Sequence, residues 1–223
     1  MLNKKDFYIN GKWVKAIDPR NYKVIDPSNE EPCAEISLGG KKDIDSAVSA
    51  AKKAFENWAF SKKEERLEFL EKLYVVYKKR WAEMAKLISL EMGAPMKFST
   101  EMQAATGASH IKSFKNILKD FKFEKDLGEE KNNQKLLYEP KGVCALITPW
   151  NWPINQVNLK VIPALASACT VVLKPSEIAP LSSMLLAEMI DEVKFPPGVF
   201  NLVNGDGAIT GDALTSHPDV DMI

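Results

Sequence analysis

The sequence has few cysteines, few histidines and no excess charge of either sign. The 30 basic and 30 acidic side chains cancel, so no long-range field attracts a phosphate backbone or an anionic membrane surface. No apolar run approaches the roughly 20 residues that cross a bilayer, and no apolar segment follows the N-terminal lysines. We therefore expect no nucleic-acid partner, no membrane partner and a cytoplasmic location.

The three cysteines and two histidines offer no metal site, triad or disulfide framework. Cys33, Cys144 and Cys169 are odd in number and lack metal-ligand spacing, and His110 and His217 show no triad or metal spacing. Cys144 and Cys169 fall in apolar stretches, and apolar surroundings raise the pKa of a thiol and suppress the thiolate. We expect structural roles for all three cysteines and no bound metal.

Residues 1–120 begin with short strands. Asn10-Gly11 separates two short apolar runs, and this dipeptide tolerates the positive φ of a tight hairpin turn. Further strands are expected at residues 24–25 and 34–36, on either side of a turn at residues 26–29.

Helices follow these strands. An apolar stripe from Ile44 to Trp58 predicts the first helix. Ser61 and Glu64 form a capping-box pattern before one long helix that Gly93 ends. A third helix is predicted from 99 to 121, with Gly107 in its middle.

Residues 121–140 differ in character from both neighbours. They are rich in charge, contain a turn candidate at Asn132-Asn133, and end in a short apolar run at residues 136–138. We predict a protruding β-hairpin, and a solvated loop fits the same pattern.

Residues 141–223 alternate short apolar strands with helices, which is typical of parallel βαβ units. We predict an α/β fold with an incomplete Rossmann-type parallel sheet, in which no turn or helix follows the last strand. The strands are expected at residues 143–148, 170–173, 199–203 and 220–223, and the helices at residues 153–168, 180–193 and 209–215.

The loop after the first of these strands holds an asparagine between two tryptophans. Ligands of a parallel sheet lie outside the carboxyl ends of its strands. Pro149 and Pro153 bias the residues before them toward extended conformations, so Asn151 lies pinned between Trp150 and Trp152. A carboxamide held in this way can donate to a developing oxyanion. The bland alternative is a turn residue beside core tryptophans.

The loops after the next two strands carry polar groups and glycines. Glu177 can accept from ribose hydroxyls, and Lys174 can reach a hydroxyl or a phosphate. Equally, Ser176 can cap a helix whose first turn holds Glu177. Gly207 and Gly211 belong to a run that approximates, but does not match, a dinucleotide-binding fingerprint, because its last spacing is one residue longer.

Together these segments carry a family resemblance. Residues 147–153, 172–177 and 197–203 resemble the aldehyde dehydrogenase superfamily, as do the opening segments 8–13 and 26–29. The resemblance covers essentially the whole chain and is weakest between Phe121 and Pro140. It implies an aldehyde dehydrogenase-like fold in which 1–120 and 141–223 belong to the cofactor-binding domain and 121–140 is an oligomerisation hairpin.

The resemblance also implies an activity, the oxidation of an aldehyde to an acid with NAD(P). Asn151 would be the side-chain oxyanion donor. Glu177 argues for NAD because a carboxylate repels a 2′-phosphate, and NADP stays possible because a long side chain can swing aside. The implied cofactor-binding residues are Ile147, Thr148, Pro149, Trp150, Lys174, Ser176, Glu177, Gly207 and Gly211.

Family members are longer than this chain. The nucleophilic cysteine and the general-base glutamate of the family have no counterpart before Ile223, so we expect an N-terminal fragment that is inactive alone. Its expected partners are an aldehyde substrate, further copies in a homo-oligomer, and possibly a separate C-terminal chain. The alternatives are an inactive nucleotide-binding module and a structural partner of a full-length subunit.

Overall fold

The strand–helix alternation predicted for residues 141–223 is present in the computed structural model, which describes residues 1–128 and 134–223. The predicted strand at residues 220–223 is a single parallel bridge between Met222 and Cys144. The elements of this part are β8 (Val143–Ile147), α6 (Pro153–Ala166), β9 (Thr170–Lys174), α7 (Leu181–Val193), β10 (Phe200–Leu202), the π-helical turn η2 (Gly207–Gly211) and α8 (Asp212–Thr215).

The central sheet has the strand order β3-β2-β10-β9-β8, and its β8–β9–β10 part is parallel as predicted. The predicted N-terminal hairpin, β2 (Asp6–Ile9) and β3 (Lys12–Lys15), extends this sheet through an antiparallel pairing with β10. Asn10 and Gly11 have φ values of 52° and 72°, as the predicted tight turn requires. The sheet is therefore mixed, because β2 runs antiparallel to β10. The two paired segments lie about 190 residues apart in sequence.

Asn201 on β10 attaches the hairpin to the sheet. Its side-chain oxygen accepts the backbone N–H of Asn10 at 2.9 Å. Its amide nitrogen donates to the carbonyl oxygens of Val171 and Gly198 at 3.1 and 2.8 Å. The Asn201 side chain is fully buried, so these bonds satisfy polar atoms that no water reaches.

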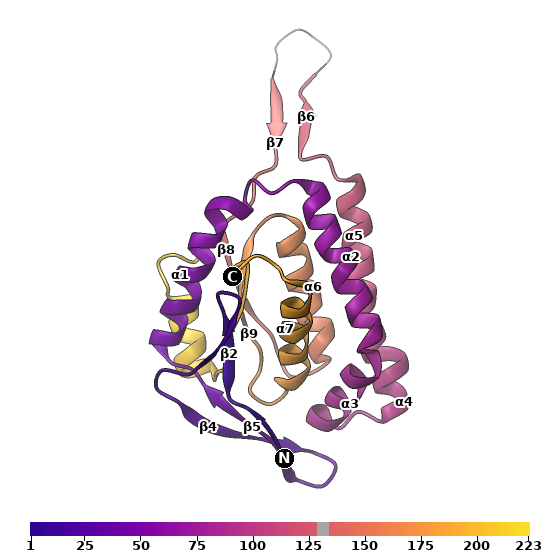
Figure 1. Cartoon of the computed structure of the whole chain (residues 1–223), viewed down its shortest axis with the longest axis vertical. Helices are drawn as coiled ribbons and strands as arrows, with labels where there is room; N and C mark the ends of the chain where they lie inside the picture. The colour runs from indigo at the N-terminus through magenta and orange to yellow at the C-terminus, as the bar shows by residue number, and fades with distance from the viewer. Residues whose placement is uncertain (129–133) are drawn as a thin grey trace.

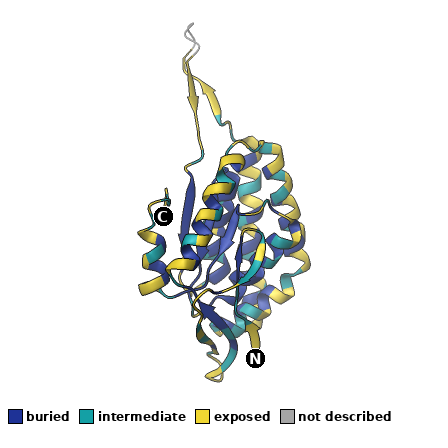
Figure 2. Cartoon of the chain, turned by 60° about the vertical axis from the view of Figure 1, so that its left-hand side comes forward, coloured by how far each residue is buried: buried dark blue, intermediate teal, exposed yellow. Residues whose placement is uncertain are grey.

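Helices cover both faces of the parallel strands, and the chain ends lie apart from the protruding hairpin (Figures 1 and 2). On one face, α1 (Lys41–Trp58) packs Ile44 and Val48 against Val143 and Val172. On the other face, α6 and α7 cover the side chains that alternate with these, such as Val171. Behind them lie α2 (Lys63–Lys79) and α5 (Ala104–Asp120).

A second sheet lies near the N-terminus and has the order β1-β5-β4. Its strands are β1 (Leu2–Lys4), β4 (Arg20–Asp26) and β5 (Glu31–Leu38), so the two strands predicted around residues 24 and 34 are present and longer than predicted. β4 places Arg20 and Tyr22 near the carboxyl edge of the central sheet.

The long helix predicted after Ser61 is two helices, α2 and α3 (Trp81–Met92), so that prediction was wrong. The break falls at Arg80, whose φ and ψ are −98° and 17°. Its guanidinium holds Glu83 at 2.7 Å and Glu188 of α7 at 2.6 Å. The predicted capping box is also wrong, because the Ser61 hydroxyl donates to the Trp58 carbonyl oxygen at 2.6 Å instead. Gly93 ends α3 in the left-handed conformation, as predicted.

The helix predicted over 99–121 is interrupted at its start. A short helix α4 (Met96–Phe98) leads into a π-helical turn, η1 (Ser99–Gln103), before α5 begins. Gly107, which weakened the prediction, lies where α2, α5 and α6 meet. The Asn158 amide donates to its carbonyl oxygen at 2.9 Å, and the Tyr77 hydroxyl donates to the Ala104 carbonyl oxygen at 2.9 Å. The glycine allows this close approach.

The described residues on either side of positions 129–133 pair as a hairpin, so this part of 121–140 is not a solvated loop. β6 (Glu124–Asp126) pairs antiparallel with β7 (Lys135–Leu137), and the strand residues are exposed (Figure 2). Phe121 packs against Phe123 and Tyr138 at the base of the hairpin. The predicted turn at Asn132-Asn133 lies outside the described residues. Among the described helices, none is both long and apolar enough to cross a membrane.

A buried carboxylate caps helix α7. Glu91 of α3 is 1% exposed and accepts the backbone N–H groups of Leu181 and, at 3.1 Å, Ser182. These are two of the N–H groups that a helix start leaves unpaired. Burial raises the pKa of Glu91 to about 7, against the opposing effect of these hydrogen bonds.

The raised pKa of Glu91 predicts a pH dependence of stability. Because the folded pKa of about 7 exceeds the unfolded value of 4.5, the folded state binds more protons between these values. Its stability therefore falls as pH rises from about 4.5 to 7. Glu91→Gln should remove this slope, which urea unfolding at several pH values measures for both proteins. A wild-type stability that rises relative to Glu91→Gln over this range would contradict the prediction.

Gly107→Ala should destabilise the fold, although alanine normally favours a helix interior over glycine by about 1 kcal/mol. A Cβ at this position would clash with the Tyr77 hydroxyl oxygen and lie 3.0 Å from an Ile154 side-chain carbon. Overpacking of this kind costs about 1–3 kcal/mol, measured as a loss in the free energy of urea unfolding. Gly40→Ala is the control, since a Cβ there would meet no atom within 4 Å. Equal stability of the two variants would refute the assignment.

Candidate cofactor-binding site

The three predicted loops meet at one edge of the central sheet, because the carboxyl ends of β8, β9 and β10 point the same way. Backbone hydrogen bonds hold the loops in register. The Thr148 N–H donates to the Lys174 carbonyl oxygen at 3.3 Å, and the Val203 N–H donates to that of Leu173 at 3.0 Å. The three loops that the sequence predicted at one edge of the sheet therefore lie side by side in the structure.

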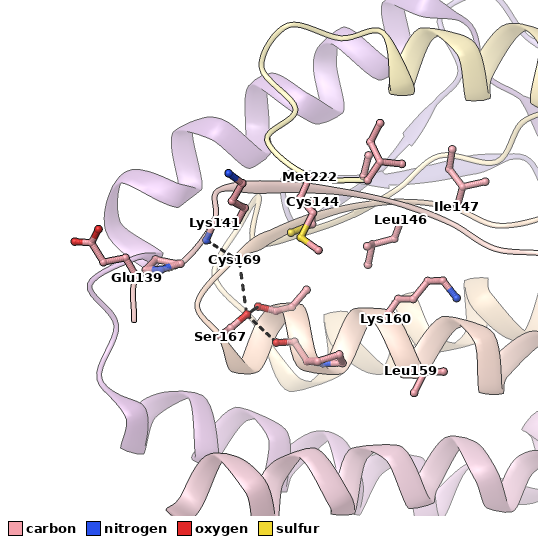
Figure 3. Close-up of a pocket in the computed structure, with 15 residues that line it drawn as sticks. Glu139, Lys141, Cys144, Leu146, Ile147, Leu159, Lys160, Ser167, Cys169 and Met222 are labelled. Carbon is pink, nitrogen blue, oxygen red and sulfur yellow. Dashed lines mark hydrogen bonds between the residues drawn. The ribbon is translucent and has the colours of Figure 1, made fainter. Parts of the chain in front are cut away.

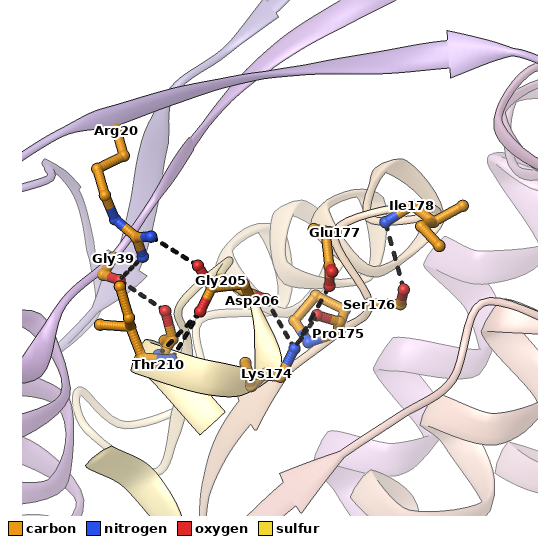
Figure 4. A network of polar contacts seen from close by, with 11 residues as sticks. Arg20, Gly39, Lys174, Pro175, Ser176, Glu177, Ile178, Gly205, Asp206 and Thr210 are labelled. Atoms are coloured by element: carbon orange, nitrogen blue, oxygen red, sulfur yellow. Dashed lines mark hydrogen bonds and ion pairs between the residues drawn. The ribbon is translucent and has the colours of Figure 1, made fainter. Parts of the chain in front are cut away.

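Lys174 lies at the centre of this edge. Its ammonium donates to the carbonyl oxygens of Gly205 at 2.7 Å and Pro175 at 3.0 Å, and it lies 3.9 Å from the Glu177 carboxylate (Figure 4). The side chain is almost fully buried. Burial lowers the pKa of Lys174 below its usual value, and the negative charges of Glu177 and Asp206 oppose that shift.

Ser176 does not cap a helix, which corrects the alternative role weighed for this loop. Its hydroxyl accepts the Ile178 N–H at 3.3 Å in a local turn, and α7 begins only at Leu181. The Glu177 carboxylate is partly exposed and accepts no hydrogen bond from the described residues. Glu177 therefore does not lie in the first turn of a helix, which was one of the two roles weighed for it.

The third loop is held by a charge pair that sequence reasoning missed. Arg20 of β4 holds Asp206 at 2.6 Å and donates to the Gly39 carbonyl oxygen at 2.9 Å (Figure 4). The Asp206 carboxylate also accepts the N–H groups of Ile209 at 2.8 Å and Thr210 at 3.4 Å, which caps η2. Burial would raise the pKa of Asp206, but these hydrogen bonds and Arg20 together lower it.

The two predicted glycines have different surroundings. Gly207 is exposed at the start of η2, and a Cβ there would meet no atom within 4 Å. Gly211 is buried at the other end of η2, where a Cβ would lie 3.5 Å from the Asp206 carbonyl oxygen and 3.8 Å from Lys174 Cε. Gly205, which was not singled out, has the tightest surroundings, because a Cβ there would clash with the Thr210 side chain.

In the first loop, Thr148 is buried, while Pro149, Trp150 and Asn151 are exposed. The expectation that the residue before Pro153 is extended was wrong. Trp152 has φ and ψ of 51° and 53°, a left-handed conformation that turns the chain from strand to helix α6. The Trp152 ring packs edge-on against Phe98 at 5.4 Å between centroids. Asn151 makes no hydrogen bond with the described residues, so its carboxamide is available to a ligand.

Tyr22 is a second residue of β4 that the sequence did not indicate. Burial, and then the negative charge of Glu177, raises the pKa of its hydroxyl above the usual value. Tyr22 and Arg20 lie two residues apart on one strand, so both face the loops after β9 and β10. The sequence analysis missed both residues, because they lie far from Lys174 in sequence and no local pattern links β4 to the loop after β9.

A separate cavity of about 500 Å³ lies between β8 and α6 (Figure 3). Of the predicted site residues, Ile147 lines it, and Lys174 and Glu177 do not. Within residues 1–128 and 134–223, no group of three or more His, Cys, Asp or Glu side chains is placed to hold a metal ion.

Comparison with known proteins decides the family. Residues 13–223 match the aldehyde dehydrogenase family. The chain belongs to this family. Family members are oxidoreductases that act on aldehydes with NAD or NADP.

Individual family members are similar to the chain over its full length. It is 48% identical to a 3-succinoylsemialdehyde-pyridine dehydrogenase from a Pseudomonas species, covering 100% of this chain and 46% of that protein. The chain therefore spans about half the length of the curated relatives that it matches.

Solved structures of the family match the fold closely. An aldehyde dehydrogenase from Bartonella henselae has a TM-score of 0.97 at 57% identity, covering all of this chain and 47% of its own. Aldehyde dehydrogenase C from Pseudomonas syringae, a mutant form solved with NAD+ and octanal, has a TM-score of 0.95 at 42% identity, covering 98% of this chain and 44% of its own. These values agree with the predicted aldehyde dehydrogenase-like α/β fold.

Asp206→Ala should destabilise the chain by about 1–2 kcal/mol, because it removes the cap of η2 and the partner of Arg20. The loss should shrink as pH falls through the lowered pKa of Asp206, where the carboxylate becomes protonated. Urea unfolding measures both effects. Asp212→Ala is the matched control, since this aspartate is exposed in the first turn of α8. Equal losses in the two variants would contradict the role of Asp206.

Proposed function

We propose that the chain forms the cofactor side of an NAD-dependent aldehyde dehydrogenase that oxidises an aldehyde to a carboxylic acid. The observation that carries this proposal is the placement of Lys174 beside Glu177 at the carboxyl edge of the sheet. Nucleotides bind at this edge in doubly wound α/β folds. Two relatives of this fold were solved with NAD+ bound, which supports the same cofactor here.

The polar groups at this edge fit a ribose. An ammonium has three hydrogens, and two of those on Lys174 are directed at the carbonyl oxygens of Pro175 and Gly205. The third remains for a ribose hydroxyl oxygen, while the Glu177 carboxylate can accept a hydroxyl hydrogen. A donor and an acceptor 3.9 Å apart match the neighbouring hydroxyls of a ribose. When bound, NAD supplies the hydride acceptor of the reaction.

The remaining residues complete the proposed cofactor site. Ile147, Thr148, Pro149 and Trp150 form the wall after β8. Ser176 shapes the loop that presents Glu177, and Gly207 and Gly211 bound the turn beside Lys174. A carboxylate at Glu177 repels a 2′-phosphate, so NAD is favoured over NADP.

Asn151 is the proposed oxyanion donor. Its exposed carboxamide lies at the start of α6, between tryptophans at positions 150 and 152. Addition of a nucleophile to an aldehyde turns the carbonyl oxygen into an oxyanion, and an amide N–H aimed at that oxygen stabilises the charge. In this role Asn151 contacts the aldehyde oxygen and does not contact the cofactor.

The nucleophile and the general base are proposed to come from protein outside these 223 residues. The matched relatives are about twice as long as this chain. We further propose that copies of the enzyme assemble through the hairpin at 121–140, whose exposed Leu137 and Tyr138 suit burial against another chain.

Binding is tested by calorimetric titration of NAD+ and NADP+ into the 223-residue chain. Lys174→Ala and Glu177→Gln should each weaken NAD+ binding about 10-fold, since each removes one charge-assisted hydrogen bond. Lys160→Ala and Glu139→Gln are matched controls, because both residues line the separate cavity. Unchanged affinity in the first pair, or equal losses in both pairs, would refute the site.

Catalysis is tested by aldehyde-dependent NADH formation, first by the chain alone and then with a C-terminal chain of the family. Asn151→Ala should lower kcat by about 10²–10³ in the combined sample and leave NAD+ affinity unchanged. Turnover by the chain alone would place the nucleophile within it. Binding without turnover in every pairing would favour a nucleotide-binding module instead.

A further inference from the structure

The loop that carries Glu177 is held at both of its ends. At its start, the buried Lys174 ammonium donates to the Pro175 carbonyl oxygen at 3.0 Å (Figure 4). At its end, the backbone enters α7 at Leu181. Between Lys174 and Leu181 every residue is buried except Glu177 and Ile178. The place of the Glu177 carboxylate therefore depends on how firmly the start of α7 is held.

Helix α7 does not cap its own first turn. Its N-cap residue is Pro180, which has no side-chain acceptor and makes no capping hydrogen bond. The first N–H groups of a helix have no acceptor within that helix, and here those of the buried Leu181 and Ser182 need one. Both donate to the Glu91 carboxylate of α3, about 90 residues away in sequence. The acceptor that fixes the end of this loop therefore comes from another helix.

The contact between Glu91 and α7 is complete within the described chain. Glu91, Leu181 and Ser182 are all buried, so no further protein is needed to enclose the contact. A buried carboxylate is costly unless its oxygens accept hydrogen bonds. The two described hydrogen bonds of the Glu91 carboxylate both run to α7. The side chain is therefore committed to the start of that helix.

A second contact fixes the position of α7 along α3. The guanidinium of Arg80, directly before α3, holds Glu188 of α7 at 2.6 Å. Glu188 lies about two helical turns beyond Leu181, and Arg80 lies about three turns before Glu91. The two contacts are thus well separated along both helices. A helix held at two separated points has a fixed position and direction, so the loop before α7 ends at a fixed point.

We propose that Glu91 is a positioning residue for NAD+ binding, because it holds the start of α7 and so keeps the Glu177 carboxylate in place beside Lys174. The proposal rests on the function proposed above. Glu91 acts through the loop and not on the cofactor, since its own carboxylate is buried against α7. Its effect on NAD+ affinity is therefore limited to what a displaced Glu177 loses, which is about 10-fold.

Glu91→Gln is the test variant, because it keeps the size of the side chain and removes one acceptor. An amide has one oxygen, so it accepts from only one of the two N–H groups and turns its own NH2 group toward the other. The measurement is calorimetric titration of NAD+ into the 223-residue chain at pH 8, above the pKa of Glu91. The variant should bind about 5–10-fold more weakly than wild type. Glu91→Asp keeps both carboxylate oxygens and should recover part of this loss.

A double-mutant cycle separates positioning from a general structural role. If Glu91 acts through Glu177, then Glu91→Gln should weaken binding by less than about twofold in a Glu177→Gln background. Glu83→Gln is the matched control, since it makes the same substitution at an exposed position of α3. Gly107→Ala is the control for lost stability, because it overpacks the fold away from this loop. Both controls should leave NAD+ affinity unchanged, and circular dichroism verifies the fold of each variant.

Amide hydrogen exchange tests the loop itself without any ligand. Inside the loop, the Ala179 N–H donates to the Ser176 carbonyl oxygen at 3.2 Å. In Glu91→Gln this N–H should exchange at least about 10-fold faster than in wild type, because local opening of the loop becomes easier. The increase should exceed any increase in Gly107→Ala, which lowers stability without releasing the loop.

Three results would overturn the proposal. The first is unchanged exchange of the Ala179 N–H in Glu91→Gln. The second is unchanged NAD+ affinity in Glu91→Gln when Lys174→Ala weakens binding. The third is a double variant in which the losses from Glu91→Gln and Glu177→Gln add. A wild-type chain that does not bind NAD+ would instead refute the function proposed above, and the exchange of Ala179 would still decide whether Glu91 holds the loop.

Discussion

The burial of β9 on both faces is the constraint on which the rest of this structure depends. Every residue from Thr170 to Lys174 is buried, with strands on both sides and helices above and below. Such a strand satisfies its backbone only through neighbouring strands, which fixes β8 and β10 beside it. Because these three strands are parallel, their carboxyl ends open at one edge. The position of Lys174 thus follows from the packing of residues that have no chemical role.

The sequence predicted the parts of the fold that depend on local patterns. The hairpin turn at Asn10-Gly11 and the βαβ alternation after Gly142 rest on turn chemistry and periodicity, and both are present. The break at Arg80 was missed, because the apolar stripe continues through it and its cause is tertiary. Glu188, about 100 residues away, holds the Arg80 guanidinium at the junction of α2 and α3.

The residues of the candidate site also divide into those that a local motif identified and those that it missed. Lys174 and Glu177 were identified because they follow an apolar strand directly, in a motif that carries the family resemblance. Arg20 and Tyr22 come from a strand of the other sheet and were invisible to that reasoning.

The attachment of the N-terminal hairpin through Asn201 has a consequence for the order of folding. Tyr8 pairs with Leu202, so β2 has one of its two partner strands late in these 223 residues. Pairing at such a separation closes a long loop, which slows folding relative to local contacts. During synthesis, β2 and β3 remain without this partner until β10 has emerged. Helices α1 and α2 are complete long before that point, so the edge of the sheet is the last part of the core to close.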